Sequence, residues 1–316
     1  MTDPFTPAMH SWIPPKLSTK EATALKARWD GLDPMAALGA PPFGRTADGR
    51  IDLRYLPLRT EDDTGKGKKR PEFNRAQFRN CDFTGASMHW LLAEHSIFEN
   101  CVFDRTVLTD FNEKGNTFSG CSFVGTDMRL AGLGSEWNNS KPGEYESVYR
   151  DCLFQDVRTA KLSVDKPVFI NCRFVFKRLK TVDWRCAGFW GCRFEGAFED
   201  MIFYGQYLYE EDRARKGCPP KAGLHATSFR DSKLRWIDLR CETPLEQVEM
   251  PADGDAFIAD TGRITADLPQ ILAVCPDEAT RVCAQMENCR ERGAATIYSN
   301  PTSLRMRPPG VGCIII

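Results

Sequence analysis

The large hydrophobic residues in the middle of this chain recur every five positions. The pattern is clearest in the series Phe73, Phe78, Phe83, Met88 and again in Phe169, Phe174, Leu179, Trp184, Phe189, Phe194. A helix would repeat every 3.6 residues and a half-buried strand every two, so neither element explains an interval of five. A chain that turns a corner after each five-residue side fits it, because four such sides close a square.

A second, longer repeat of twenty residues contains the first. The phrase FRNCDF at Phe78 returns as FENCVF, FSGCSF, FINCRF and FWGCRF, with Cys81, Cys101 and Cys121, then Cys152, Cys172 and Cys192, each twenty residues apart. Periodicity of this length predicts a solenoid whose coils stack at about 4.8 Å, like neighbouring strands. The cysteines occupy a small inward position with parallel Cβ vectors, so we expect packing and no disulfides.

With both intervals in place, the chain resembles the pentapeptide-repeat family. The resemblance covers about 72–240 and implies an all-β solenoid, a right-handed quadrilateral β-helix with 20 residues per coil. The FxxCxF coils are similar to those of the branch that protects type II topoisomerases, DNA gyrase and topoisomerase IV, from quinolones. That similarity implies a possible role in antibiotic resistance.

The repeat also predicts the division of the chain. We expect an N-terminal irregular or helical flank at 1–71, the β-helix at 72–240 with loops near 132–147 and 205–224, and a C-terminal cap at 241–316 with one helix at about 277–292 and a flexible tail. In the flank, Ser18 and Glu21 form a capping-box pattern that predicts a short helix ending near Gly31. In the β-helix, the five-residue interval continued after Phe194 would bury the charge of Glu199. We therefore expect a one-residue slip that turns Phe198, Met201 and Phe203 inward.

Charge and composition exclude several functions. The formal net charge of the 316 residues is −1, which argues against a globally basic nucleic-acid binder, and we expect no direct nucleic-acid contact. Thirteen cysteines without a signal-peptide pattern at the N-terminus favour a cytoplasmic protein. Four histidines, none at metal-ligand spacing, and no phosphate-binding or nucleophile motif lead us to expect no catalytic residue, no metal and no cofactor.

A rigid rod with loops and charged faces is typical of a scaffold for protein–protein interaction. We expect the loops to supply exposed hot-spot residues, at Trp137, Asn138, Tyr145, Tyr207, Tyr209 and Arg213. Residues 161–240 hold 16 bases and 10 acids, and Arg158 with Arg178, and Arg173 with Arg193, recur at twenty and predict a basic stripe. The partner is open: the family resemblance implies DNA gyrase or topoisomerase IV as an alternative to an unidentified protein.

The C-terminal residues leave two further alternatives open. Cys313 and the three isoleucines after it match the C-a-a-X pattern, so a prenylated, membrane-anchored effector is one reading, and a short apolar tail is the other. Membrane contact is expected only if Cys313 carries a lipid. The family resemblance also implies a possible homodimer through the C-terminal end.

Overall fold

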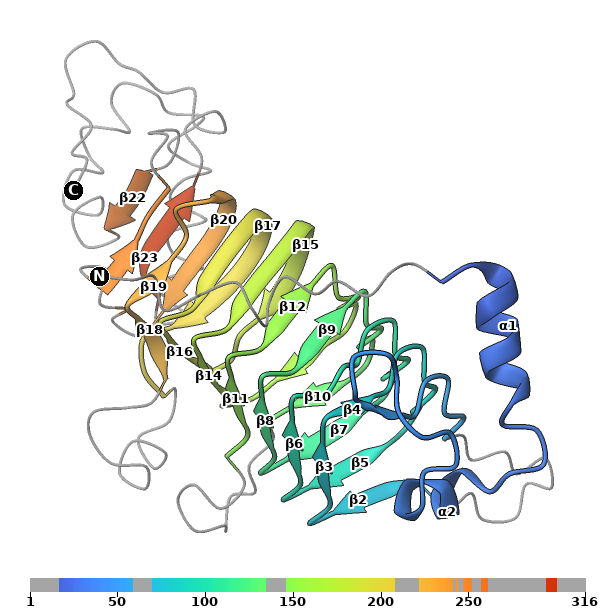
Figure 1. Cartoon of the computed structure of the whole chain (residues 1–316). Coiled ribbons are helices and arrows are strands. Elements are labelled where there is room, and N and C mark those ends of the chain that lie inside the picture. The colour runs from blue at the N-terminus through green and yellow to red at the C-terminus, as the bar shows by residue number, and fades with distance from the viewer. Residues whose placement is uncertain are drawn as a thin grey trace, which may run out of the picture.

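The computed structural model describes residues 17–58, 70–134, 146–207, 222–240, 243, 247–251, 257–260 and 294–299. Within these residues the chain winds into a four-sided parallel β-helix, with two short helices, α1 (Thr19–Ala27) and α2 (Pro34–Gly39), at its N-terminal end (Figure 1). The predicted fold class is confirmed.

Three sides of the square are sheets and the fourth is a row of single bridges. Sheet 1 contains β2 (Glu72–Asn74), β5 (Leu92–Glu94), β7 (Asn112–Lys114), β10 (Gly132–Leu133) and β13 (Ser163–Val164). Sheet 2 contains β3 (Gln77–Arg79), β6 (Ile97–Glu99), β8 (Thr117–Ser119), β11 (Val148–Arg150), β14 (Val168–Ile170), β16 (Gly188–Trp190) and β18 (Gly223–His225). Sheet 3 contains β9 (Ser122–Val124), β12 (Leu153–Gln155), β15 (Arg173–Asp183), β17 (Arg193–Tyr204), β19 (Thr227–Ser228), β20 (Ser232–Arg240) and β21 (Val248–Glu249). On the same side, β1 (Ile51–Asp52) pairs with β4 (Cys81–Asp82), and single bridges at Val102 join this pair to β9. Side 4 links Pro57, Ser87, Val107, Asp127 and Arg158.

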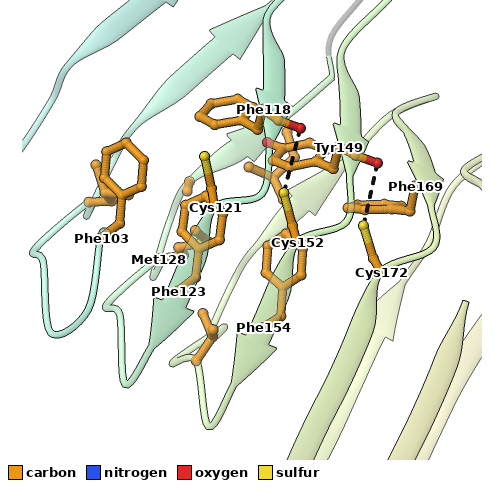
Figure 2. Packing of buried hydrophobic residues seen from close by; sticks show 14 of the residues in the cluster. Phe103, Phe118, Cys121, Phe123, Met128, Tyr149, Cys152, Phe154, Phe169 and Cys172 are labelled. Carbon is orange, nitrogen blue, oxygen red and sulfur yellow. Dashed lines mark hydrogen bonds between the residues drawn. The ribbon is translucent and has the colours of Figure 1, made fainter. Parts of the chain in front are cut away.

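The interior is built from stacked aromatic rings. The Phe98 and Phe118 ring centroids lie 4.6 Å apart, with the ring planes at 6°. Phe118 in turn stacks on Tyr149, at 4.7 Å between centroids and 3° between planes (Figure 2). Stacked aromatic pairs stabilise a fold beyond the burial of their area. Each coil therefore adds rings to a continuous column.

The small inward position that cysteine occupies in each coil carries a hydrogen-bond donor. The Cys152 thiol donates to the backbone carbonyl of Phe118 at 3.5 Å, and the Cys172 thiol to that of Tyr149 at 3.4 Å (Figure 2). Where the corresponding position of another side holds Thr106 or Ser232, the hydroxyl makes the equivalent bond. The six cysteines of the repeat are buried and unbridged, which confirms the packing role expected of them.

The predicted slip at Glu199 is present. The register of β15 against β17 shifts between Phe176 and Leu179, so that Leu179 lies beside Phe198 rather than Glu199. Phe198, Met201 and Phe203 are buried. The shift leaves the Glu199 carboxylate on the outer surface, where water and neighbouring bases solvate it.

The β-helix begins earlier than expected. β1 pairs in parallel with β4, with Ile51 opposite Cys81, and Leu53, Leu56 and Leu58 are buried in the core. The predicted start at residue 72 was therefore too late, because this partial coil is separated from the regular repeat by the charged run at 59–69. That run lies outside the described residues.

The rest of the N-terminal flank covers the first coil. Helix α1 has the predicted capping box between Ser18 and Glu21. Immediately after the helix, Arg28 donates two hydrogen bonds of 2.7 Å to the Asp52 carboxylate, and the Trp29 indole donates to the Arg54 carbonyl at 2.9 Å. These contacts fix the flank to the end of the solenoid, where unpaired strand edges need cover.

At the other end, two antiparallel strands extend sheet 3. β23 (Ala294–Ser299) pairs with β20, and β22 (Phe257–Asp260) pairs with β23. The helix expected at about 277–292 falls outside the described residues and stays a prediction. In the described part of the chain, no helix has the length and apolar character needed to cross a membrane.

Candidate functional site: the loop corner

Both insertions in the repeat leave the rod at the same corner, the one between sheets 1 and 2. Residues 135–145 are inserted between β10 and β11, and residues 208–221 between the end of β17 and β18. In the two coils between them the corner is short and is turned by Lys166 and Cys186, both at positive φ. β11 and β18 are three coil steps apart, or about 14 Å at the spacing of neighbouring strands. We call this edge the loop corner.

A buried acid holds both ends of the first insertion. Glu113 on β7 is fully buried, and its carboxylate accepts hydrogen bonds from the Gly134 backbone N–H at 2.7 Å and from the Ser147 hydroxyl. Asn116 Nδ2 at 3.0 Å and the Tyr149 hydroxyl at 3.1 Å complete four donors. Since Gly134 precedes the insertion and Ser147 follows it, one side chain fixes the two stems together.

Burial raises the pKa of the Glu113 carboxyl, and the hydrogen bonds from Ser147, Asn116, Tyr149 and Gly134 oppose that rise. Desolvation of an acid inside a protein favours its neutral form, whereas donors aimed at the oxygens favour the ionised form. The sequence contains the signal for this residue: Glu113 stands on the five-residue beat, five after Leu108 and five before Phe118. The sequence prediction passed over it.

The second insertion is held by packing. Tyr207 and Ala222, which flank residues 208–221, form a small buried cluster with Cys186. A ring nitrogen of His225 lies 2.9 Å from the Ala222 carbonyl, and the His225 ring stacks on Trp190 with 3.9 Å between centroids. The stem of this insertion is therefore also fixed to the rod.

The expectation that Tyr207 is an exposed contact residue was wrong. Its side chain is only 1% exposed, because it packs at the base of the insertion instead of projecting from it. Trp137, Asn138, Tyr145, Tyr209 and Arg213, together with Cys313, lie outside the described residues and stay predictions.

The predicted basic stripe is interrupted by acids. Arg173 and Arg193 lie side by side in register as expected, but Arg173 forms an ion pair with Glu195 at 2.9 Å. Arg178 pairs with Glu199 at 2.6 Å, and Arg158 lies 3.7 Å from Asp127. The face around these four arginines carries mixed charge, and its role in binding stays a prediction.

The chemistry of the described side chains is that of a packed rod. In the described ranges, no group of three or more His, Cys, Asp or Glu residues is placed to hold a metal ion. Burial raises the pKa of the Cys121, Cys152 and Cys172 thiols well above the ordinary value. Because the thiolate is the reactive form, these cysteines are suited to packing and not to nucleophilic attack.

No known protein-family model and no curated protein matches the chain. Among solved structures, it is similar to QnrB1, a plasmid-mediated fluoroquinolone resistance protein, with 17% identity over 63% of this chain and 86% of that one and a TM-score of 0.30. It is also similar to HetL, a pentapeptide-repeat protein involved in heterocyst differentiation regulation from the cyanobacterium Nostoc, with 9% identity over 58% and 86% and a TM-score of 0.26.

The four-sided parallel β-helix that the sequence repeat implied is given by the strands of the chain itself. At TM-scores of 0.30 and below, these superpositions are too loose to inform function. The loop corner therefore has to be interpreted from its own residues.

Proposed function

We propose that this protein is a non-enzymatic scaffold that binds a protein partner through the loop corner. The observation that supports the proposal most directly is that two insertions leave one edge of the rod about 14 Å apart, each with its stems fixed. Insertions elsewhere in the repeat would point in different directions. Two on one edge present their residues to the same partner.

The interior of the rod supports this reading. The core is filled by a column of stacked rings and by small side chains that donate hydrogen bonds to the preceding coil. Because such a core is closely packed, the coils form a stiff support. Binding residues in proteins are commonly carried on loops that a rigid framework positions. A stiff framework also lowers the entropy that association costs, because fewer segments have to be ordered on binding.

Protection of a type II topoisomerase from quinolone-like inhibitors is the second candidate. The FxxCxF coils, which resemble those of the protecting branch, and the two insertions on one corner favour it. The net charge of −1 and the flanks at both ends depart from a simple mimic of acidic DNA. Under this candidate the insertions, and not the charge of the rod, would contact the enzyme.

Loop deletion tests both candidates. In one variant residues 135–145, and in another residues 208–221, are replaced by a short Gly-Ser linker, and circular dichroism confirms that the rod still folds. Pull-down from the native host followed by mass spectrometry should recover a partner with the full chain and lose it with either deletion. Retention of the same partner by both deletion variants would refute a role for the loop corner.

A supercoiling assay then separates the two candidates. If the partner is gyrase or topoisomerase IV, the full chain should restore supercoiling in the presence of a quinolone and the loop variants should not. No restoration, with a different partner recovered, would leave the scaffold and remove the topoisomerase role.

We also propose a cytoplasmic location, with a lipid anchor on Cys313 as the alternative. Cys313→Ser should leave the protein's fractionation unchanged if the tail is only a short apolar segment. A shift of the variant out of the membrane fraction would support prenylation instead.

A further inference from the structure

The strands β15, β17 and β20, with 11, 12 and 9 residues, are the longest in the described part of the chain. In the preceding coil, four residues at positive φ turn the corners: Asp151, Asp156, Lys161 and Lys166. In the next coil only Asn171, Thr181 and Cys186 do so, and β15 runs unbroken through the missing corner. Figure 1 shows β15, β17 and β20 as long parallel arrows at this point. Two sides of the square have merged into one sheet.

Exposed bases gather on the outer surface of this merged sheet. They are Lys177, Arg178, Lys180, Lys233 and Arg235, which we call the merged-sheet bases. Lys180, Glu199 and Arg235 lie side by side on the three strands, and Lys233 lies beside Ala197. The surface therefore follows directly from the register of the three strands.

Only part of this positive charge is neutralised. Glu199 accepts hydrogen bonds from Arg178 and Lys180, and these bonds lower the pKa of Glu199, so it stays ionised. Within the described part of the chain, Lys177, Lys233 and Arg235 form no ion pair.

The exposed Asp200 and Asp231 also lie along these strands and at their margin. The Asp156 carboxylate accepts a hydrogen bond from the Lys177 backbone N–H at 2.9 Å, so counting five bases against the four acids Glu199, Asp200, Asp231 and Asp156 leaves a net charge of +1. The surface is thus positive, but mixed in sign.

Mixed charge favours a protein over a nucleic acid as the occupant. Nucleic-acid sites commonly neutralise about 6–10 phosphates with bases, and acids among the bases repel the backbone. Lys233 and Arg235 are two residues apart on one strand, so their side chains repeat at about 6.6 Å. Alternate carboxylates of an extended acidic segment repeat at the same interval, because they obey the same geometry.

We propose that the merged-sheet bases are a docking surface for an acidic segment of a partner protein, separate from the loop corner. This inference rests on the proposed scaffold function and adds to it the chemistry of one partner surface. Complementary charge at such a surface sets orientation and the rate of association more than it sets affinity.

The test uses the full-length chain and two defined probes, a labelled oligoglutamate peptide and a duplex DNA of similar net charge. The variant combines Lys177→Gln, Lys233→Gln and Arg235→Gln. The matched control combines Arg75→Gln, Arg150→Gln and Lys161→Gln, which removes three exposed bases from other parts of the rod. All six side chains are exposed, so both triple variants should fold, and circular dichroism verifies this.

We expect the oligoglutamate to bind the wild-type chain and the control equally, and the variant at least about tenfold more weakly, with the difference shrinking as salt is raised. Equal binding by the variant, tighter binding of DNA than of peptide, or no peptide binding at all would each overturn the inference. The pull-down of the preceding subsection is independent: a partner lost on loop deletion but kept by the variant would leave the proposed function standing while the docking surface fails.

Discussion

Glu113 offers the most direct test of how the rod holds its first insertion. Its carboxylate receives four donors, two of which, Gly134 N–H and the Ser147 hydroxyl, belong to the stems of residues 135–145. Glu113→Gln keeps the size of the side chain but puts an NH₂ group where an oxygen accepted hydrogen bonds. Glu113→Ala removes every acceptor and opens a cavity.

The expected costs follow from these contacts. A buried donor left without an acceptor costs about 1–3 kcal/mol. In Glu113→Gln the Ser147 hydroxyl can rotate and accept from the new NH₂ group, so only one donor should lose its acceptor. The free energy of unfolding should therefore fall by about 1–3 kcal/mol. Glu113→Ala should cost more than Glu113→Gln, because it leaves several buried donors without an acceptor at about 1–3 kcal/mol each. The loss should be local to the stems and to Tyr149, the ring of the aromatic column that donates to Glu113, since the rings of more distant coils do not contact this carboxylate.

Hydrogen exchange measured by mass spectrometry reads this directly. Peptides that cover 112–134 and 146–150 should exchange faster in both variants, while peptides of β15 and β17 stay as in the wild type. Glu94→Gln on the neighbouring strand of sheet 1 is the matched control and should change neither region. Two results would refute the idea that Glu113 holds the two stems together locally: unchanged hydrogen exchange at the stems in Glu113→Ala, or an equal increase in exchange along the whole rod.

The difference between wild type and Glu113→Gln should also depend on pH. Burial raises the pKa of Glu113 in the folded state, so the folded chain binds the proton more tightly than the unfolded chain. The stability contributed by the protonated group is therefore fully present below the ordinary pKa of 4.5 and is lost as pH rises through the folded-state value. Denaturant unfolding of the two proteins from acid to neutral pH should show the wild type losing its advantage in that direction.

Three further substitutions test the rod itself. Cys121→Ser should be nearly neutral and Cys121→Ala should cost about 1 kcal/mol in thermal unfolding, because only the hydroxyl can replace the thiol donor to Phe98; equal effects of the two would contradict this. Burial acts to raise the pKa of Asp52, but hydrogen bonds from Arg28 and Arg54 hold that pKa well below its usual value. Asp52→Asn should therefore loosen the attachment of α1 at neutral pH. The wild type should lose the same contribution to stability only as pH falls below 3.8. An amide-exchange profile of α1 in both proteins checks it. Gly196→Ala should cost about 3 kcal/mol or more in denaturant unfolding, because at φ +107° its Cβ would overlap the Phe176 carbonyl; a stable variant would mean that the strand can shift there.

The fold was predictable because its signal is repeated many times. Each coil places a ring and a small donor residue at the same positions, so the repeat remains recognisable even where one coil departs from it. The slip at Glu199 was predictable for the related reason that a charge on the beat conflicts with burial.

What the sequence did not reveal depends on contacts that occur once. The early coil at Ile51–Leu58 is a single partial turn with no repeat to support it. Glu113 sits on the beat like Glu199, yet here the backbone keeps its register and four donors solvate the acid. The burial of Tyr207 depends on Cys186 and Ala222, which meet only in the folded chain.

The thiol donors that recur once per coil have a consequence for how such a rod can change in length. The Cys172 thiol bonds to the carbonyl of Tyr149, one coil earlier, just as the Cys152 thiol bonds to that of Phe118, so every coil is a template for the next. A whole coil can be duplicated or deleted and the new neighbours still match, whereas a change of length within a side has to be absorbed locally, as the register shift between Phe176 and Leu179 is. Additions are therefore tolerated at corners, and both insertions of this chain are found at one.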